Sequence, residues 1–108
     1  MMVALVQDLF FAARVESLAK SSGAAAQITT TPDEFVRWIH EVNPSHVLLD
    51  LTMVSDNILD VVAGVPHVAG FGPHVQREQF LNARQHGIKT LWANSALPDR
   101  LPGWLLQG

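Results

Sequence analysis

The stretch HVLLDL, His46 to Leu51, is a nearly continuous apolar run that contains one carboxylate, Asp50. Runs of this kind are typical of strands in a parallel sheet that is covered by helices on both faces. A lone acid at the end of such a strand is either a reactive group at the edge of the sheet or a polar residue that ends the strand. The order of the surrounding elements bears on this choice.

Strand-like runs alternate with helical patterns along the whole chain. We expect strands at 3–7, 24–30, 46–51, 66–71 and 88–93. Apolar residues at helical spacing and capping signals predict helices at 9–22, 32–43, 55–64 and 75–86. The tail from Asn94 to Gly108 contains Pro98 and Pro102, so a final helix is expected to be short or broken.

The strongest local signal is TPDEF, where Thr31 can cap a helix and Pro32 occupies the first helical position. Glu34 completes the pattern of a capping box. Helical spacing also predicts inward-facing side chains in two helices: Phe35, Val36, Ile39 and Val42 in the second, and Phe80, Leu81 and Ala83 in the fourth.

The alternation of strands and helices predicts parallel strands joined by right-handed crossovers. We therefore expect one domain, residues 1–108, with a three-layer α/β/α architecture and a five-stranded parallel sheet. Sites in such sheets form outside the carboxyl ends of the strands. The residues that follow the strands are Gln7 and Asp8, Asp50 to Thr52, Phe71 to Pro73, and Asn94 with Ser95.

The composition limits the functions that the chain can have. Its 108 residues and 48% apolar content suffice for one hydrophobic core. A net charge of −3 with seven Lys and Arg argues against nucleic-acid binding, because phosphate contacts need clustered cations. No stretch approaches the ~20 apolar residues of a membrane span, and we expect no secretory signal. The chain has no cysteine for disulfides or thiolate chemistry, and we expect a reducing cytoplasm.

At its strand ends the chain resembles the receiver domain of bacterial response regulators, over nearly its whole length, and this resemblance implies a flavodoxin-like topology with the strand order 2-1-3-4-5. Receivers carry an acidic pair after the first strand, where this chain has Gln7 and Asp8. They carry the phosphate-accepting aspartate at the end of the third strand, where LLDLTMV has Asp50. The resemblance implies that Thr52 lends a backbone carbonyl to a metal and that Val54 stands in the place of a proline. The run NARQHGIKTLWANS is similar to the receiver sequence around the fifth strand.

Several positions depart from the receiver pattern. Gln7 replaces the first acid, Phe71 aligns with the receivers' hydroxyl residue, and Asn94 aligns with their lysine. Ser95 follows where proline is usual. The lysine and the hydroxyl of receivers bind phosphoryl oxygens, so their loss removes a positive charge and a binding group. The resemblance therefore implies a degenerate receiver, or pseudo-receiver, in which Asp50 holds the acceptor position without most of the phosphorylation machinery.

Two alternatives stay open at the strand ends. One is a phosphorylatable receiver in which Asp8, Asp50 and Thr52 hold Mg²⁺. The simpler interpretation is an inherited polar edge, with Asp8 as the N-cap of the first helix. The other alternative is a nucleotide-type small-ligand site in the strand-end cleft, which comprises Gln7, Phe71, Gly72, Asn94 and Ser95.

The loop GFGPH, Gly70 to His74, is the remaining candidate binding element. It is similar to an (F/Y)-G-x-H stretch in short bacterial receiver-like proteins, a resemblance that names no activity. A helix start with glycines can hold an anion, but Pro73 lacks an N–H donor, and a tight turn is the simpler interpretation. No two histidines have the H-x-x-x-H spacing of a helical metal site, and His74 is the only histidine at this loop.

The apolar tail is a candidate interaction surface. Trp104, Leu105 and Leu106 either cover the sheet or join Trp92 in an exposed apolar patch. In receivers the fourth helix, fifth strand and last helix form the usual surface for dimers and partners. We therefore expect a stand-alone, non-enzymatic receiver-like protein without a cofactor. It would act in signalling or regulation by binding a protein partner or forming a homodimer.

Overall fold

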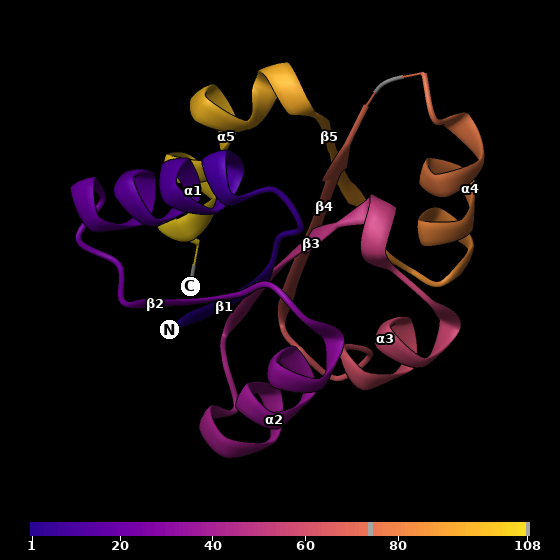
Figure 1. Ribbon diagram of the computed structural model, residues 1–108, viewed down its shortest axis with the longest axis horizontal. Helices are drawn as coiled ribbons and strands as arrows, with labels where there is room; N and C mark the ends of the chain where they lie inside the picture. The colour runs from indigo at the N-terminus through magenta and orange to yellow at the C-terminus, as the bar shows by residue number, and fades with distance from the viewer. Residues whose placement is uncertain (74, 108) are drawn as a thin grey trace.

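The protein is a five-stranded parallel sheet between layers of helices (Figure 1). The computed structural model describes residues 1–73 and 75–107, so His74 lies outside the described residues. The strands are β1 Met2–Leu5, β2 Ala26–Thr29, β3 His46–Asp50, β4 His67–Gly72 and β5 Thr90–Ala93. Their order is β2-β1-β3-β4-β5, and all neighbouring strands are parallel, which confirms the predicted topology.

Helices follow the strands in the predicted alternation. They are α1 Leu9–Ser21, α2 Pro32–Val42, α3 Asp56–Val61, α4 Arg77–Gln85 and α5 Leu97–Leu105. Two short 3-10 turns, η1 Leu51–Met53 and η2 Asn94–Ala96, follow β3 and β5. Within the described ranges, no helix has the length and apolar character needed to cross a membrane.

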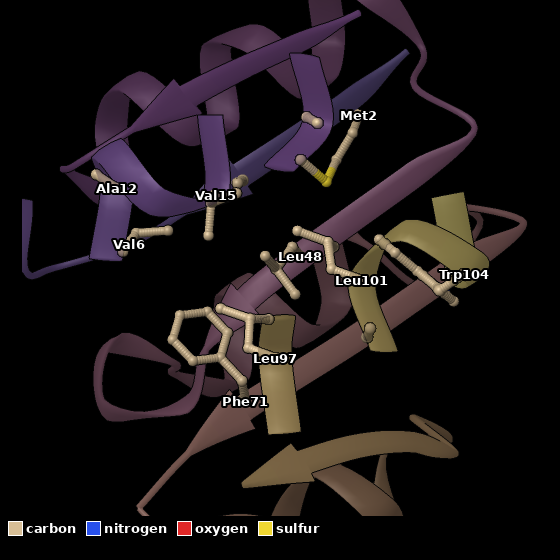
Figure 2. Close-up of a cluster of buried hydrophobic side chains, with 12 residues drawn as sticks. Met2, Val6, Ala12, Val15, Leu48, Phe71, Leu97, Leu101 and Trp104 are labelled. Atoms are coloured by element: carbon tan, nitrogen blue, oxygen red, sulfur yellow. The ribbon is translucent and has the colours of Figure 1, made fainter. Parts of the chain in front are cut away.

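Each face of the sheet has its own hydrophobic core. Ala4 and Leu48 point toward α1 and α5 (Figure 2 shows this cluster), whereas Val47 and Leu49 point toward α2, α3 and α4. All residues of β1 and β3 are buried. This double coverage explains why the stretch around β3 is apolar at consecutive positions rather than at alternate ones.

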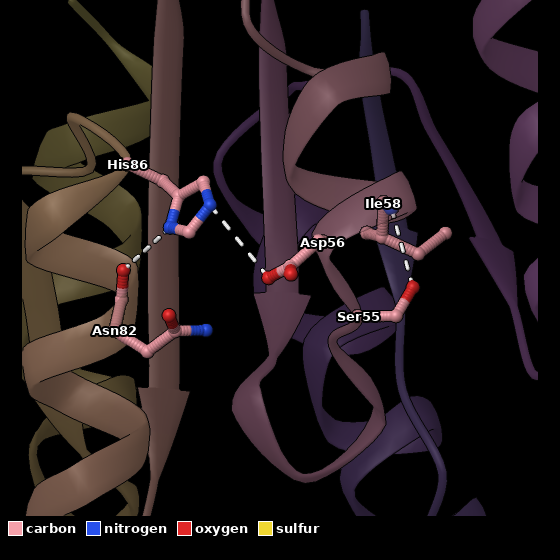
Figure 3. Close-up of polar contacts among 5 residues, drawn as sticks. All are labelled: Ser55, Asp56, Ile58, Asn82 and His86. Atoms are coloured by element: carbon pink, nitrogen blue, oxygen red, sulfur yellow. Dashed lines mark hydrogen bonds and ion pairs between the residues drawn. The ribbon is translucent and has the colours of Figure 1, made fainter.

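Capping side chains start α2 and α3 where the sequence predicts them. The backbone N–H of Glu34 donates to Thr31 Oγ1 at 3.3 Å, and that of Ile58 donates to Ser55 Oγ at 3.3 Å (Figure 3). These bonds satisfy N–H groups that have no partner inside the helix. Among the hydrogen bonds of the described residues, the reciprocal bond of a capping box from the Glu34 side chain is absent.

Two predictions about helices are wrong. The third helix was expected to run from a cap at Ser55 to a stop at Gly64, but α3 ends at Val61 and turn residues follow. In α4, Leu81 was expected to face inward with Ala83, yet Leu81 is 58% exposed and Ala83 is buried. In a helix of 3.6 residues per turn, side chains two residues apart point in directions that differ by about 200°. Leu81 and Ala83 therefore cannot both face the sheet.

The end of α4 is tied to the start of α3 by a side-chain contact. His86 Nε2 lies 3.6 Å from Asp56 Oδ1, and His86 Nδ1 lies 2.9 Å from the carbonyl oxygen of Asn82 (Figure 3). Gly87 then ends the helix with φ of +90°, a left-handed conformation that favours glycine. The chain then enters β5 at Thr90.

The final helix is short, as expected, but it continues through Pro102. Proline cannot donate a backbone hydrogen bond, so one bond of α5 is missing at this residue. Packing of its buried side stabilises the helix, because Leu97, Leu101 and Trp104 enter the core beside α1 (Figure 2).

Candidate functional site

Asp50 lies at the carboxyl end of β3 and borders a cavity of about 320 Å³. The lining residues come from the ends of β1, β3, β4 and β5 and from the start of α1, and they are Gln7, Asp8, Phe11, Asp50, Thr52, Phe71, Pro73 and Asn94. The sheet therefore brings together residues that are far apart in the sequence. Among these described lining residues, two are carboxylates and none is a lysine, arginine or histidine.

The carboxylate of Asp50 is held by groups of the protein itself. Oδ2 accepts a bond from the backbone N–H of Gln7 at 3.1 Å. Oδ1 accepts from the backbone N–H of Thr52 at 3.0 Å and from its hydroxyl at 2.6 Å. The side chain is 7% exposed, so these donors replace most of its water. Asp50 thus joins the end of β1 to the turn η1.

Asp8 is the N-cap of α1. Its Oδ1 accepts bonds from the backbone N–H groups of Phe10 at 2.7 Å and Phe11 at 3.3 Å. The carboxylate also lies at the positive end of the helix dipole, where a negative charge is favourable. This arrangement agrees with the interpretation of Asp8 as an N-cap on an inherited polar edge, because Oδ1 already accepts the bonds that start the helix.

Phe71 closes the side of the cavity that faces β4. It stands opposite Asp50 in the β3–β4 register and is 1% exposed. Its ring lies 5.7 Å from that of Phe11, tilted by 40°. The neighbouring Gly72 is buried and would place a Cβ 3.5 Å from the Cβ of Leu51, so it lies beneath η1 and not in the cavity.

Solved structures of receiver domains and response regulators match the fold. The signal receiver domain of a Vibrio parahaemolyticus protein aligns with a TM-score of 0.78 and 18% identity, over 94% of this chain and 83% of that domain. A response regulator receiver protein from Burkholderia phymatum aligns with a TM-score of 0.77 and 21% identity, over 96% and 93%. A response regulator from Thermotoga maritima aligns with a TM-score of 0.75 and 11% identity, over 98% and 97%.

The chain has the receiver fold. No protein-family model and no curated protein sequence matches it. The match therefore lies in the shape of the backbone, and the end of β3 in the receiver fold is where the sequence resemblance places Asp50. The side chains around that position decide what the site can do.

The remaining strand-end residues divide between two cavities. Asn94 borders the Asp50 cavity and also a second one of about 530 Å³ beside the start of α1. Ser95 lines only this second cavity, together with Phe10 and Arg14. The cleft predicted from the sequence therefore comprises two adjoining hollows, and Gly72 contributes to neither of them.

The cavity around Asp50 does not fit a resident magnesium ion well. Mg²⁺ needs near-octahedral oxygen ligands at about 2.0–2.1 Å. Oδ1 of Asp8 caps α1, and both oxygens of Asp50 already accept bonds from the chain. Within residues 1–73 and 75–107, no group of three or more His, Cys, Asp or Glu residues is placed to hold a metal.

The tail residues cover the sheet, which is one of the two arrangements considered for them. Trp104 is 4% exposed and meets the ring of Trp92 edge-on at 5.6 Å, so it cannot belong to an exposed patch. Leu105 packs partly against the same core, and Leu106 is 76% exposed. The predicted interaction surface is therefore corrected: α5 turns its apolar side inward and leaves Leu106 outside.

Sequence reasoning missed the apolar surface at the start of α1. Phe10 is 88% exposed and lines the second cavity beside Arg14, whereas Phe11 is half-buried. Neighbouring helical residues point about 100° apart, so the pair FF after an N-cap indicates that one ring faces solvent. That signal was available in the sequence.

Proposed function

We propose that this chain is a non-enzymatic receiver-like protein that acts in signalling or regulation through protein–protein contact, without phosphorylation of Asp50. The observation that supports this most directly is the state of the carboxylate. Both of its oxygens accept bonds from Gln7 and Thr52, and no cationic side chain occurs among the described residues that line its cavity.

Phosphoryl transfer to a carboxylate needs positive charge around the transferred group. Here the cavity already contains the carboxylates of Asp8 and Asp50. An aspartyl phosphate would place a doubly charged group beside the carboxylate of Asp8, with Asn94 where receivers have lysine. A buried phenyl ring, that of Phe71, stands where they have a hydroxyl. These features favour a site that contributes to the fold and not to a phosphorylation switch.

The surface that we assign to partner binding, here called the α4–tail surface, comprises α4, β5 and α5. Leu81 of α4 and Leu106 after α5 are exposed apolar side chains on or beside it. A groove of about 530 Å³ between α4 and β5 is lined by Arg77, Phe80, Leu81, Arg84, Leu91 and Ala93.

The lack of cysteine suits such a protein to a reducing cytoplasm.

The test is incubation with acetyl phosphate and Mg²⁺, followed by intact-mass spectrometry. We expect no stoichiometric phosphoryl adduct on the wild-type chain. The matched control is Asp50→Asn, which removes the acceptor oxygen and should give the same mass spectrum. A stable adduct that appears on the wild type and disappears in this variant would favour the phosphorylatable alternative and sink the proposal.

A small-ligand site remains the second candidate because the two strand-end cavities share Phe11 and Asn94. A ligand that binds the native state raises the melting temperature by mass action. A thermal-shift screen of nucleotides and flavins tests this, with Asn94→Leu as the variant that should abolish any shift. If Asn94→Leu leaves a shift unchanged, the ligand binds elsewhere.

A further inference from the structure

The edge strand β5 differs from the central strands in its surroundings. It is the last strand of the sheet, next to β4 on one side only, and all four of its residues are half-buried (Figure 1). The α4 groove described above lies on one face of the strand. A second groove of about 480 Å³ lies on the other, lined by Thr90, Trp92, Asp99, Arg100, Gly103, Trp104 and Gln107. We call this the α5 groove.

The side chains of β5 divide between these grooves in strict alternation. Leu91 and Ala93 line the α4 groove, and Thr90 and Trp92 line the α5 groove. Successive residues of a strand point to opposite faces, so a chain running alongside β5 would place alternate side chains in the two grooves. This is the arrangement found where an extended peptide adds a strand to a sheet.

The outer edge of β5 has free backbone groups. Parallel pairing with β4 uses the groups on one side of the strand. Outside helices and strands, no backbone bond of residues 90–93 occurs among the described residues, although Ala93 is the N-cap of η2. Proteins commonly protect such edges with prolines, charges or bulges. The strand Thr-Leu-Trp-Ala contains neither a proline nor a charged residue.

The charges of the α4 groove indicate what kind of chain would fit. Arg77 and Arg84 flank Phe80 and Leu81 on α4. The two arginines are seven residues apart, about 10.5 Å along the helix, and therefore lie on the same side of it. Neither has a carboxylate within salt-bridge distance in the described part of the chain. The groove thus offers an apolar centre between two guanidinium groups, and it has no acidic lining residue.

We propose that β5 is a docking site for an extended acidic segment of a partner protein, which adds to the sheet as a sixth strand. The segment carries an apolar residue with an Asp or Glu two positions before and two positions after it. Those three side chains share one face of a strand, and the outer two are about 13 Å apart, within reach of flexible arginines. This inference rests on the proposed function, because it names the partner of the α4–tail surface.

The probe is a blocked, fluorescein-labelled peptide with the core Glu-Thr-Ile-Thr-Glu, followed by fluorescence anisotropy. We expect saturable binding by the wild-type protein. The same peptide with Lys in place of both Glu residues should bind at least about tenfold more weakly, because two attractions become repulsions. In the bound state, some amides of β5 should exchange with solvent more slowly, as measured by NMR.

Strand addition, as opposed to simple groove binding, is tested by N-methylation. A strand uses the N–H groups of alternate residues on each edge. One peptide is methylated on the amides of both Thr residues, and another on the amides of Ile and the second Glu. One of the two should lose binding and the other should keep it. Equal binding of both peptides would overturn the proposal.

The protein variants are Arg77→Glu with Arg84→Glu, and a matched control with two exposed arginines reversed elsewhere, Arg14→Glu with Arg37→Glu. Both double variants change the net charge equally. We expect the first to lose the acidic peptide and to gain the Lys peptide, and the control to keep the wild-type preference. Equal losses in both, with unchanged melting temperatures, would mean that long-range charge alone holds the peptide.

Two further outcomes separate this inference from the proposed function. If the peptide fails to bind and sedimentation velocity shows a dimer, the inference is wrong, while the proposed function stands because it requires only protein–protein contact. If Asp50 forms a phosphoryl adduct but the peptide binds as expected, the claim that Asp50 is not phosphorylated fails and the docking site stands. Failure of binding by a monomeric protein overturns the inference.

Discussion

Phe71 is the residue that distinguishes this site most clearly from a phosphate-binding pocket. Its ring is buried against Phe11 and stands opposite Asp50 on the neighbouring strand. Removing a buried phenyl ring costs transfer free energy and leaves a cavity. At the residue scale, then, Phe71 stabilises the sheet at the place where a receiver would handle its phosphoryl group.

Phe71→Ala should lower the free energy of unfolding by about 3–5 kcal/mol. The measurement is urea denaturation followed by circular dichroism. Phe10→Ala is the matched control, since Phe10 is 88% exposed and its loss should change stability by no more than about 0.5 kcal/mol. Similar losses in the two variants would show that Phe71 does not contribute core packing.

His46 makes stability depend on pH at the opposite end of β3. It is 6% exposed, stacks on His67 at 4.6 Å and has Nε2 3.2 Å from the carbonyl oxygen of Trp104. Burial lowers the pKa of His46 below its ordinary value of 6.5, and His67 and the N-terminal amine lower it further. Hydrogen bonds to the backbone of Trp104 and Gln107 act in the opposite direction.

The sign of the pH effect follows from this lowered pKa. Below pH 6.5 His46 binds a proton in the unfolded chain but remains neutral in the folded chain until the pH reaches its lower folded pKa. The free energy of unfolding is therefore highest above pH 6.5 and decreases as the pH falls toward the folded pKa. His46→Gln should lose less stability than the wild type between about pH 7.5 and about pH 5. Urea denaturation at both values measures this. His40→Gln, at an exposed position, should keep the wild-type slope.

At the scale of elements, helix starts with a capping side chain were the easiest to predict. Thr31 and Ser55 cap α2 and α3 at the predicted positions. The start of α4 has no side-chain cap at Gln76, and there the predicted start at Val75 was two residues early. A cap is a local interaction that the sequence contains in full. The limits of α4 depend instead on packing against β4 and η1, and η1 is distant in the sequence.

The start of α1 depends on Asp8. Asp8→Ala should lower the free energy of unfolding by about 1 kcal/mol, because two N–H groups lose their acceptor, and Asp8→Ser should restore most of this loss. Thermal and urea unfolding measure both variants. Glu16→Ala is the control for charge, as it removes an exposed carboxylate from the same helix. If Glu16→Ala costs as much as Asp8→Ala, charge and not capping explains the effect.

At the scale of the whole molecule, the alternating pattern predicted the parallel sheet and its layers, and the receiver resemblance supplied the strand order. The strand-end rule also placed Gln7, Asp8 and Asp50 around one cavity. It could not predict that Asp50 is satisfied by Gln7 and Thr52, or that Gly72 lies under Leu51. Those facts depend on side-chain directions in the irregular residues after each strand. No period of apolar residues specifies those directions.

The inward turn of α5 is another long-range property, and it leads to the last prediction. Leu97 and Leu101 are fully buried and Trp104 is 4% exposed, next to α1 and the ring of His46. Burying each such side chain is worth about 1.5–3 kcal/mol, and small domains are stable by only about 5–15 kcal/mol in total. Loss of all three therefore removes much of the margin that keeps the domain folded.

A chain that ends at Ala96 should accordingly show no cooperative unfolding transition by circular dichroism or calorimetry. A chain that ends at Leu106 keeps α5 and should melt close to the full-length protein. The comparison separates the contribution of α5 to stability from that of the exposed end of the tail. Only the chain that ends at Ala96 uncovers the face of the sheet beside α1. Cooperative melting of the shorter chain near the wild-type temperature would show that the sheet and the first four helices fold without α5.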